Sequence, residues 1–226
     1  MDCAGLRGPC PMLDCMRFLA GLWRLAIAAL CFVGTYQAWQ TPSRWTYFSF
    51  QAGFLLGLVM LWAGAASLLK GIQPPAWLKG CLTVYAILTL LASLLLMPAD
   101  KQQSLPLVWG IMATTVLCYV VPIMTLTDFL LCDPHRRFKW HYTFSWLVYL
   151  PAYLAFVVIR AQLWPHSGPA AGGSPYPYAF IDLPALGWIQ FGINVFELLA
   201  VCAGLGLVAF LIDHILPAKP LLGRVR

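Results

Sequence analysis

Three polar side chains, Gln190, Asn194 and Glu197, follow one another at intervals of four and three residues inside an apolar run. This spacing places them on one face of a helix. If the run crosses a membrane with its centre near Ala200, a rise of ~1.5 Å per residue puts Glu197 roughly 4 Å and Gln190 roughly 15 Å from the middle. Such a polar column can line a binding or catalytic pocket, or it can be a set of hydrogen bonds between helices. Both interpretations stay open.

A second candidate group lies in the run between residues 107 and 131, where Cys118 shares a helix face with hydroxyl side chains. Pro122 has no N–H, so it leaves the carbonyl of Cys118 without its helical donor and predicts a kink. Asp128 follows near the basic end of the run, where we expect it either to pair with Arg136 or Arg137 or to cap the kinked bundle.

Other nucleophiles and metal ligands give weaker signals. Ser49 has neither a G-x-S-x-G motif nor an adjacent histidine. The four histidines lie at or beyond the ends of the apolar runs, and the cysteines before residue 16 have loose spacing. We therefore predict no metal site and no cofactor.

The composition is that of a membrane protein. Of the 226 residues, 61% are hydrophobic and only 10% are charged, whereas a soluble domain has about 25% charged residues. The apolar runs predict an all-α, polytopic protein in which residues 1–226 form a single membrane domain with six transmembrane helices. The predicted spans are about residues 18–38, 46–69, 77–97, 107–131, 142–160 and 187–212.

The charge distribution predicts the orientation. The net charge is +6, and the basic residues gather at span ends rather than on a polar face. We therefore expect membrane lipids, not nucleic acid, as partners. Eleven lysines and arginines fall on the side of both termini and three on the other, so both termini are expected to be cytoplasmic. Arg24, within the first span, is expected to snorkel to the near interface.

The loop after the fifth span ends in Ser174-Pro-Tyr-Pro-Tyr-Ala-Phe-Ile-Asp182. Alternating proline and tyrosine favour a stiff, extended segment. Tyr176 and Tyr178 are expected either to anchor it at the membrane surface or to cover the polar column as a lid, with Asp182 fixing its backbone.

Several segments together resemble the androgen-induced protein family, which includes the androgen-dependent regulator of tissue factor pathway inhibitor. The most specific is Tyr176-Pro-Tyr-Ala-Phe-Ile-Asp182, followed in family order by Gly187 and Asn194. The earlier segments are Trp45-Thr-Tyr-Phe-Ser-Phe-Gln51, Cys118-Tyr-Val-Val-Pro122 with Asp128 and Asp133-Pro134, and Trp146-Leu-Val-Tyr-Leu-Pro-Ala-Tyr153. The chain looks most like the bacterial branch, which implies an integral protein of the bacterial plasma membrane.

The resemblance also implies a chemistry. Animal members look like intramembrane hydrolases of fatty acid esters of hydroxy fatty acids, with a threonine nucleophile and a histidine. These positions fall on Ser49 and Cys118 here, and a neutral thiol is a poor general base. At a helical rise of ~1.5 Å per residue, Ser49 lies roughly 13 Å outward from the centre of its predicted span. Cys118 lies close to the centre of its own span.

Two functions follow as hypotheses. The first is a non-catalytic membrane protein that binds a lipid or acyl chain in an outward-opening polar pocket. The second is a hydrolase of lipid esters with Ser49 as nucleophile. Whether the chain is an enzyme is left open.

Overall fold

The computed structural model describes residues 11–95, 111–166, 168 and 174–219. This part of the chain is helical, without a β-strand, and contains six helical segments long and apolar enough to cross a membrane. The predictions of an all-α fold and of six spans are therefore confirmed. The predicted connection between the third and fourth spans lies outside the described residues.

The first three spans are single helices: α1 (Pro11–Gln40), α2 (Phe48–Leu68) and α3 (Ala76–Leu95). A short 3-10 turn, η1 (Pro42–Thr46), joins α1 to α2. The close approach of α1 and α2 depends on small residues. A Cβ added at Gly57 would lie 2.9 Å from the Cβ of Cys31, and one at Gly64 would lie 3.1 Å from the backbone oxygen of Gly21. Glycines therefore let these two helices pack with little separation.

The fourth and fifth spans are interrupted. The fourth consists of α4 (Ala113–Thr115), a π-helical turn η4 (Val116–Val120) and α5 (Val121–Cys132). The fifth, predicted as one helix, consists of α6 (Tyr142–Ser145) and α7 (Tyr149–Leu163). Pro151 accounts for this second break, because it has no N–H and its ring clashes with the carbonyl four residues earlier.

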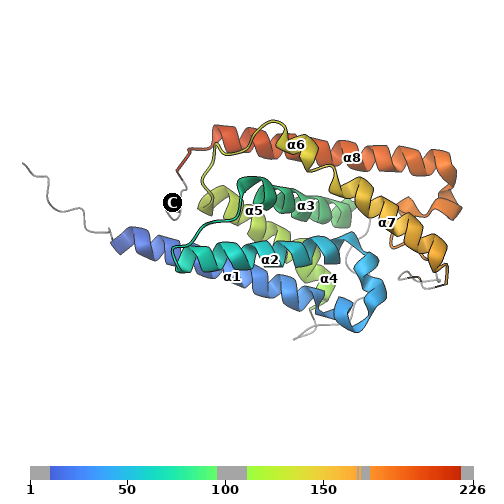
Figure 1. Cartoon of the computed structure of the whole chain (residues 1–226), viewed down its shortest axis with the longest axis horizontal. Coiled ribbons are helices and arrows are strands. Elements are labelled where there is room, and N and C mark those ends of the chain that lie inside the picture. Colours follow the sequence, from blue (N-terminus) through green and yellow to red (C-terminus); the bar gives the residue numbers. More distant parts are fainter. Residues whose placement is uncertain (1–10, 96–110, 167, 169–173, 220–226) are drawn as a thin grey trace, which may run out of the picture.

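The sixth span, α8 (Leu183–Ile215), is the longest helix and follows the short turn η5 (Ala179–Ile181). It bends near its start at Gly187, whose φ of 72° suits a residue without a side chain. In Figure 1, α8 runs along one side of the bundle, α1 and α2 along the opposite side, and α3 and α5 lie between them.

Candidate functional site

A cavity lies at the end of the bundle where α2 begins. Its apolar wall consists of Phe48, Leu88, Ala92, Leu150, Leu154, Phe180, Ile181 and Leu198. Its polar side chains are Ser49, Thr89, Ser93, Cys118, Tyr153 and Tyr178, all of them hydroxyls or a thiol. We call it the hydroxyl cavity. Among the described residues that line it, none is a histidine, lysine, arginine, aspartate or glutamate.

The two residues expected to carry chemistry meet in this cavity. Ser49 lies in the first turn of α2 and Cys118 in the π turn, and both side chains line this cavity. Within the described residues, the helical part of the fourth span is Ala113–Cys132. Measured from the centre of this segment, Cys118 lies roughly 7 Å outward.

The π turn is the form that the predicted interruption takes. It ends just before Pro122, the second residue of α5, whose missing N–H interrupts the helical hydrogen-bond pattern at this point. A π turn accommodates one more residue than an α-turn and is frequent at functional sites. Cys118 is buried at its centre, with 1% of its surface exposed.

Tyrosine side chains hold the start of α2. The residue that precedes the helix, Tyr47, makes no side-chain cap. Instead, the hydroxyl of Tyr153 donates to the carbonyl of Thr46 at 2.8 Å, and the Tyr178 ring packs edge-on against that of Tyr47, with 5.4 Å between the ring centroids. Burial raises the pKa of Tyr178 well above its ordinary value. Tyr178 is therefore a hydrogen-bond donor to this cavity and not a base.

The segment from Ser174 to Asp182 contributes Tyr178, Phe180 and Ile181 to the wall of the cavity, whereas the lid interpretation placed this segment over the polar column. Asp182 accepts hydrogen bonds from the Ser174 hydroxyl at 2.8 Å and from the backbone N–H of Ala185 at 3.4 Å, so it caps α8. Tyr176 is buried beneath the segment. Neither Tyr176 nor Asp182 lines the cavity; both fix the segment that carries Tyr178 into it.

The polar column of α8 lies beside the cavity and not inside it. Asn194 and Glu197 line a groove between α3 and α8, which we call the lateral groove. The groove shares Leu88, Ala92, Phe180 and Leu198 with the hydroxyl cavity, so the two spaces adjoin. Asn194 donates to the carbonyl of Phe180 at 2.8 Å and accepts from Gln190 at 2.8 Å. Gln190 is exposed and lines neither space.

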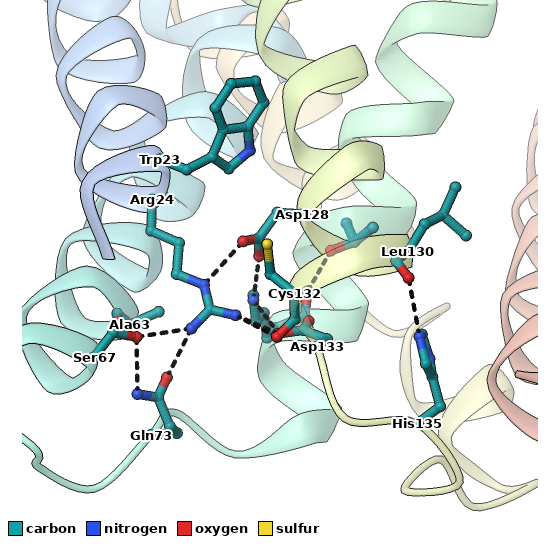
Figure 2. Close-up of polar contacts among 12 residues, drawn as sticks. Trp23, Arg24, Ala63, Ser67, Gln73, Asp128, Leu130, Cys132, Asp133 and His135 are labelled. Atoms are coloured by element: carbon teal, nitrogen blue, oxygen red, sulfur yellow. Dashed lines mark hydrogen bonds and ion pairs between the residues drawn. The ribbon is translucent and has the colours of Figure 1, made fainter. Parts of the chain in front are cut away.

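A second polar centre lies at the opposite end of the bundle and was not predicted. Arg24, Lys79, Asp128 and Asp133 form what we call the ionic cluster. Figure 2 shows the Arg24 guanidinium facing Asp128 and Asp133, with Ser67 and Gln73 on its other side. Arg24 donates to Asp128 at 2.9 Å and to Asp133 at 2.8 Å. Lys79 contacts both carboxylates at 2.5 Å. Two positive and two negative charges thus balance one another in the bundle.

This arrangement corrects two expectations. Asp128 pairs with Arg24 and Lys79, not with Arg136 or Arg137, whose side chains are exposed. Arg24 does not snorkel, because only 1% of its surface is exposed. The loop of Arg136 and Arg137 is tied instead to α8, where the Asp213 carboxylate accepts the backbone N–H of Arg137 at 2.8 Å. A signal was present in the sequence: opposite charges at membrane depth need partners at the same depth.

Within the described residues, no group of three or more histidine, cysteine, aspartate or glutamate side chains could hold a metal ion. Cys3 and Cys10 lie outside the described part. The site that emerges is therefore a neutral cavity of hydroxyls and one thiol, with an apolar wall and an adjoining groove. A scan against protein-family models found none that matches the chain, and searches of curated proteins and of solved structures returned no match.

Proposed function

We propose that the chain binds an amphiphile within the membrane, with a small uncharged polar group in the hydroxyl cavity and an acyl chain in the lateral groove. The observation that carries this proposal is the composition of the cavity. Hydroxyls and a thiol gather at one end of an apolar space that continues into a groove along α3 and α8. Small-molecule sites are typically apolar with a few placed polar groups.

The sizes of the two spaces favour this division of the ligand. The cavity volume is about 50 Å³ in the hydroxyl cavity and about 260 Å³ in the lateral groove. The cavity suits a hydroxyl, carbonyl or ester with a few methylenes, and a bulky headgroup exceeds it. The groove suits the longer part of a chain.

The chemistry of the lining favours an uncharged polar group. A carboxylate or phosphate in the cavity would lack a cation among the described lining residues, and a buried unpaired charge is costly. A carbonyl or hydroxyl would instead accept hydrogen bonds from Ser49, Ser93 or protonated Tyr178. This is the pattern expected for esters and alcohols.

The charge bias supports an orientation for the site. Arg17, Arg24, Lys70, Lys79 and the loop at 136–139 lie toward the end of the ionic cluster, as the positive-inside rule expects of cytoplasmic residues. On this orientation both termini are cytoplasmic and the hydroxyl cavity opens toward the outer leaflet. The resemblance to the bacterial branch of the androgen-induced protein family supports a bacterial plasma membrane.

The proposal is tested with photoreactive amphiphiles on the purified full chain in lipid nanodiscs. We expect a diazirine-bearing monoacylglycerol to crosslink to residues of the cavity and groove, and the matching fatty acid to crosslink much less. Ala92 lines both spaces, so Ala92→Phe should abolish the crosslink. Ala155→Phe is the matched control, since Ala155 is exposed on α7 and lines neither space. Equal labelling of Ala92→Phe and the control would remove the proposal.

A second function, hydrolysis of a lipid ester, is favoured by one observation. Ser49 lies at the start of a helix beside Cys118, at the positions that the resemblance gives to a nucleophile and its partner. However, no general base is among the described lining residues. A fluorophosphonate probe on the purified protein separates the two functions. Labelling that disappears in Ser49→Ala would establish the nucleophile, whereas ligand crosslinking without such labelling favours binding alone.

A further inference from the structure

The sixth span, α8, is far less covered by protein than the other spans. In its most apolar window 17% of residues are buried, against 28% to 61% in the other five. One side of α8 contacts α3, α6 and η5, and the other side carries large apolar residues such as Phe196 and Leu207. Lipid chains satisfy apolar residues of this kind, so exposure alone indicates no partner.

Glu197 does not fit a lipid-facing surface. It lies close to the middle of α8, at the edge of the lateral groove, and its side chain is exposed. It makes no hydrogen bond or ion pair with any described residue. An ionised carboxylate at this depth is costly, and a neutral carboxyl carries both a donor and an acceptor that hydrocarbon cannot satisfy.

Small residues stand next to Glu197 on the exposed face. Ala200 and Gly204 are exposed and separated by one turn, in the small-xxx-small spacing that allows close helix contact. A Cβ added at Gly204 would meet nothing within 4 Å. At 3.6 residues per turn, Gly204 is only about 20° around the helix from Glu197. A polar group and a site of close backbone approach thus share one face.

We propose that this face, formed by Glu197, Ala200 and Gly204, binds α8 of a second copy of the chain in a parallel, two-fold symmetric dimer. Symmetry supplies the matching partner. Two copies inserted in the same direction hold Glu197 at the same depth, and two neutral carboxyls satisfy each other by reciprocal hydrogen bonds. A helix of another protein would need a polar group at this same depth. Close contact at Gly204 then brings the two carboxyls within reach.

The test uses the full chain, singly labelled and reconstituted in lipid vesicles over a range of protein-to-lipid ratios. Single-molecule photobleaching counts the chains per spot. The wild type should pass from one to two bleaching steps as its density rises. Gly204→Leu should raise the apparent dissociation constant about tenfold or more, because close approach is lost. Glu197→Leu should raise it roughly threefold to tenfold, and Glu197→Gln, which keeps a donor and an acceptor, should change it little.

Gly192→Leu is the matched control. Gly192 is also exposed on α8 with nothing within 4 Å of an added Cβ, but it lies about 120° around the helix from Gly204. The Gly192→Leu variant should dimerise like the wild type. Single bleaching steps at every density would overturn the proposal, and so would an equal loss of dimer in Gly192→Leu and Gly204→Leu. A dimer that persists unchanged in Glu197→Leu would overturn the role of the carboxyl.

Discussion

Neutralising Asp128 should destabilise the protein more than removing any other single charge of the ionic cluster. The side chain is fully buried and accepts from Arg24 at 2.9 Å and from Lys79 at 2.5 Å. Asp128→Asn keeps the size of the side chain and leaves two buried cations facing one remaining carboxylate, Asp133. Removing one partner of a buried ion pair costs about 3–5 kcal/mol, because the charge left behind is not compensated.

The charge balance predicts a partial rescue. In Lys79→Met/Asp128→Asn, one cation and one anion remain, Arg24 and Asp133, which already contact each other at 2.8 Å. The double variant should therefore be about 1–3 kcal/mol more stable than the sum of the two single effects, as expected for coupled residues. Removal of Lys79 alone is also unfavourable, because it leaves two carboxylates with one arginine.

Equilibrium unfolding in mixed micelles with increasing dodecyl sulfate measures these free energies. Asp133→Asn is the matched control: it loses contacts with the same two cations, but its side chain is 17% exposed and water can replace part of the loss. Its cost should be smaller than that of Asp128→Asn. Strict additivity in the double variant, or a larger effect at Asp133 than at Asp128, would refute the reasoning from charge balance.

Three further predictions concern the opposite end of the bundle. Tyr153→Phe removes the hydrogen bond to Thr46 and should cost about 1–2 kcal/mol in the same unfolding assay, whereas Tyr36→Phe, at an exposed position, should cost nothing measurable. Asp182→Ala should cost about 1 kcal/mol as a lost helix cap, and Asp182→Asn, which can still accept, should recover most of it. Because burial raises the pKa of Tyr178, the unfolded chain loses this proton first; stability should therefore fall as pH rises above about 10, and less steeply in Tyr178→Phe.

Hydropathy and charge were enough to predict the six spans, because each must be long and apolar enough to cross hydrocarbon. The boundaries failed where backbone hydrogen bonding, not hydropathy, ends a helix. Ile111 and Met112 are apolar but precede the first residue of α4, Ala113, and the fifth helix is broken ahead of Pro151. An apolar segment outside a helix has the same hydropathy as one inside, so this signal could not separate them.

The partners of the buried charges were harder to predict than the spans. Asp128 was assigned to the basic residues nearest in sequence, yet its partners Arg24 and Lys79 are 104 and 49 residues away. Helix order alone does not determine which faces meet in a bundle. The lining of the hydroxyl cavity was hard to predict for the same reason. The resemblance pointed to Ser49 and Cys118, but the place of Ser93 and Thr89 depends on how α3 is rotated against α2.

The π turn joins the two polar ends of the molecule and absorbs one extra residue between them. Cys118 faces the hydroxyl cavity before the end of this turn, and Asp128 faces the ionic cluster after it. Deleting Val120, which is 38% exposed, would remove the extra residue, so the span would form a regular α-helix with its two halves in the same relative orientation. Deleting Ile123 as well, which is 55% exposed in α5, would rotate the two halves by ~100°, so that only one of the two side chains keeps its place.

The single deletion should therefore keep both the monoacylglycerol crosslink and most of the stability, as should Val120→Ala, whereas the double deletion should lose either the crosslink or several kcal/mol of stability. If Asp128 keeps its partners in the double deletion, the ionic cluster maintains the stability of the fold and Cys118 is rotated out of the cavity. Crosslinking should then fail in a double-deletion variant that still unfolds near the wild-type midpoint. A double deletion with wild-type crosslinking and stability, or a single deletion that loses both, would show that the extra residue of the π turn does not set the register between the two ends.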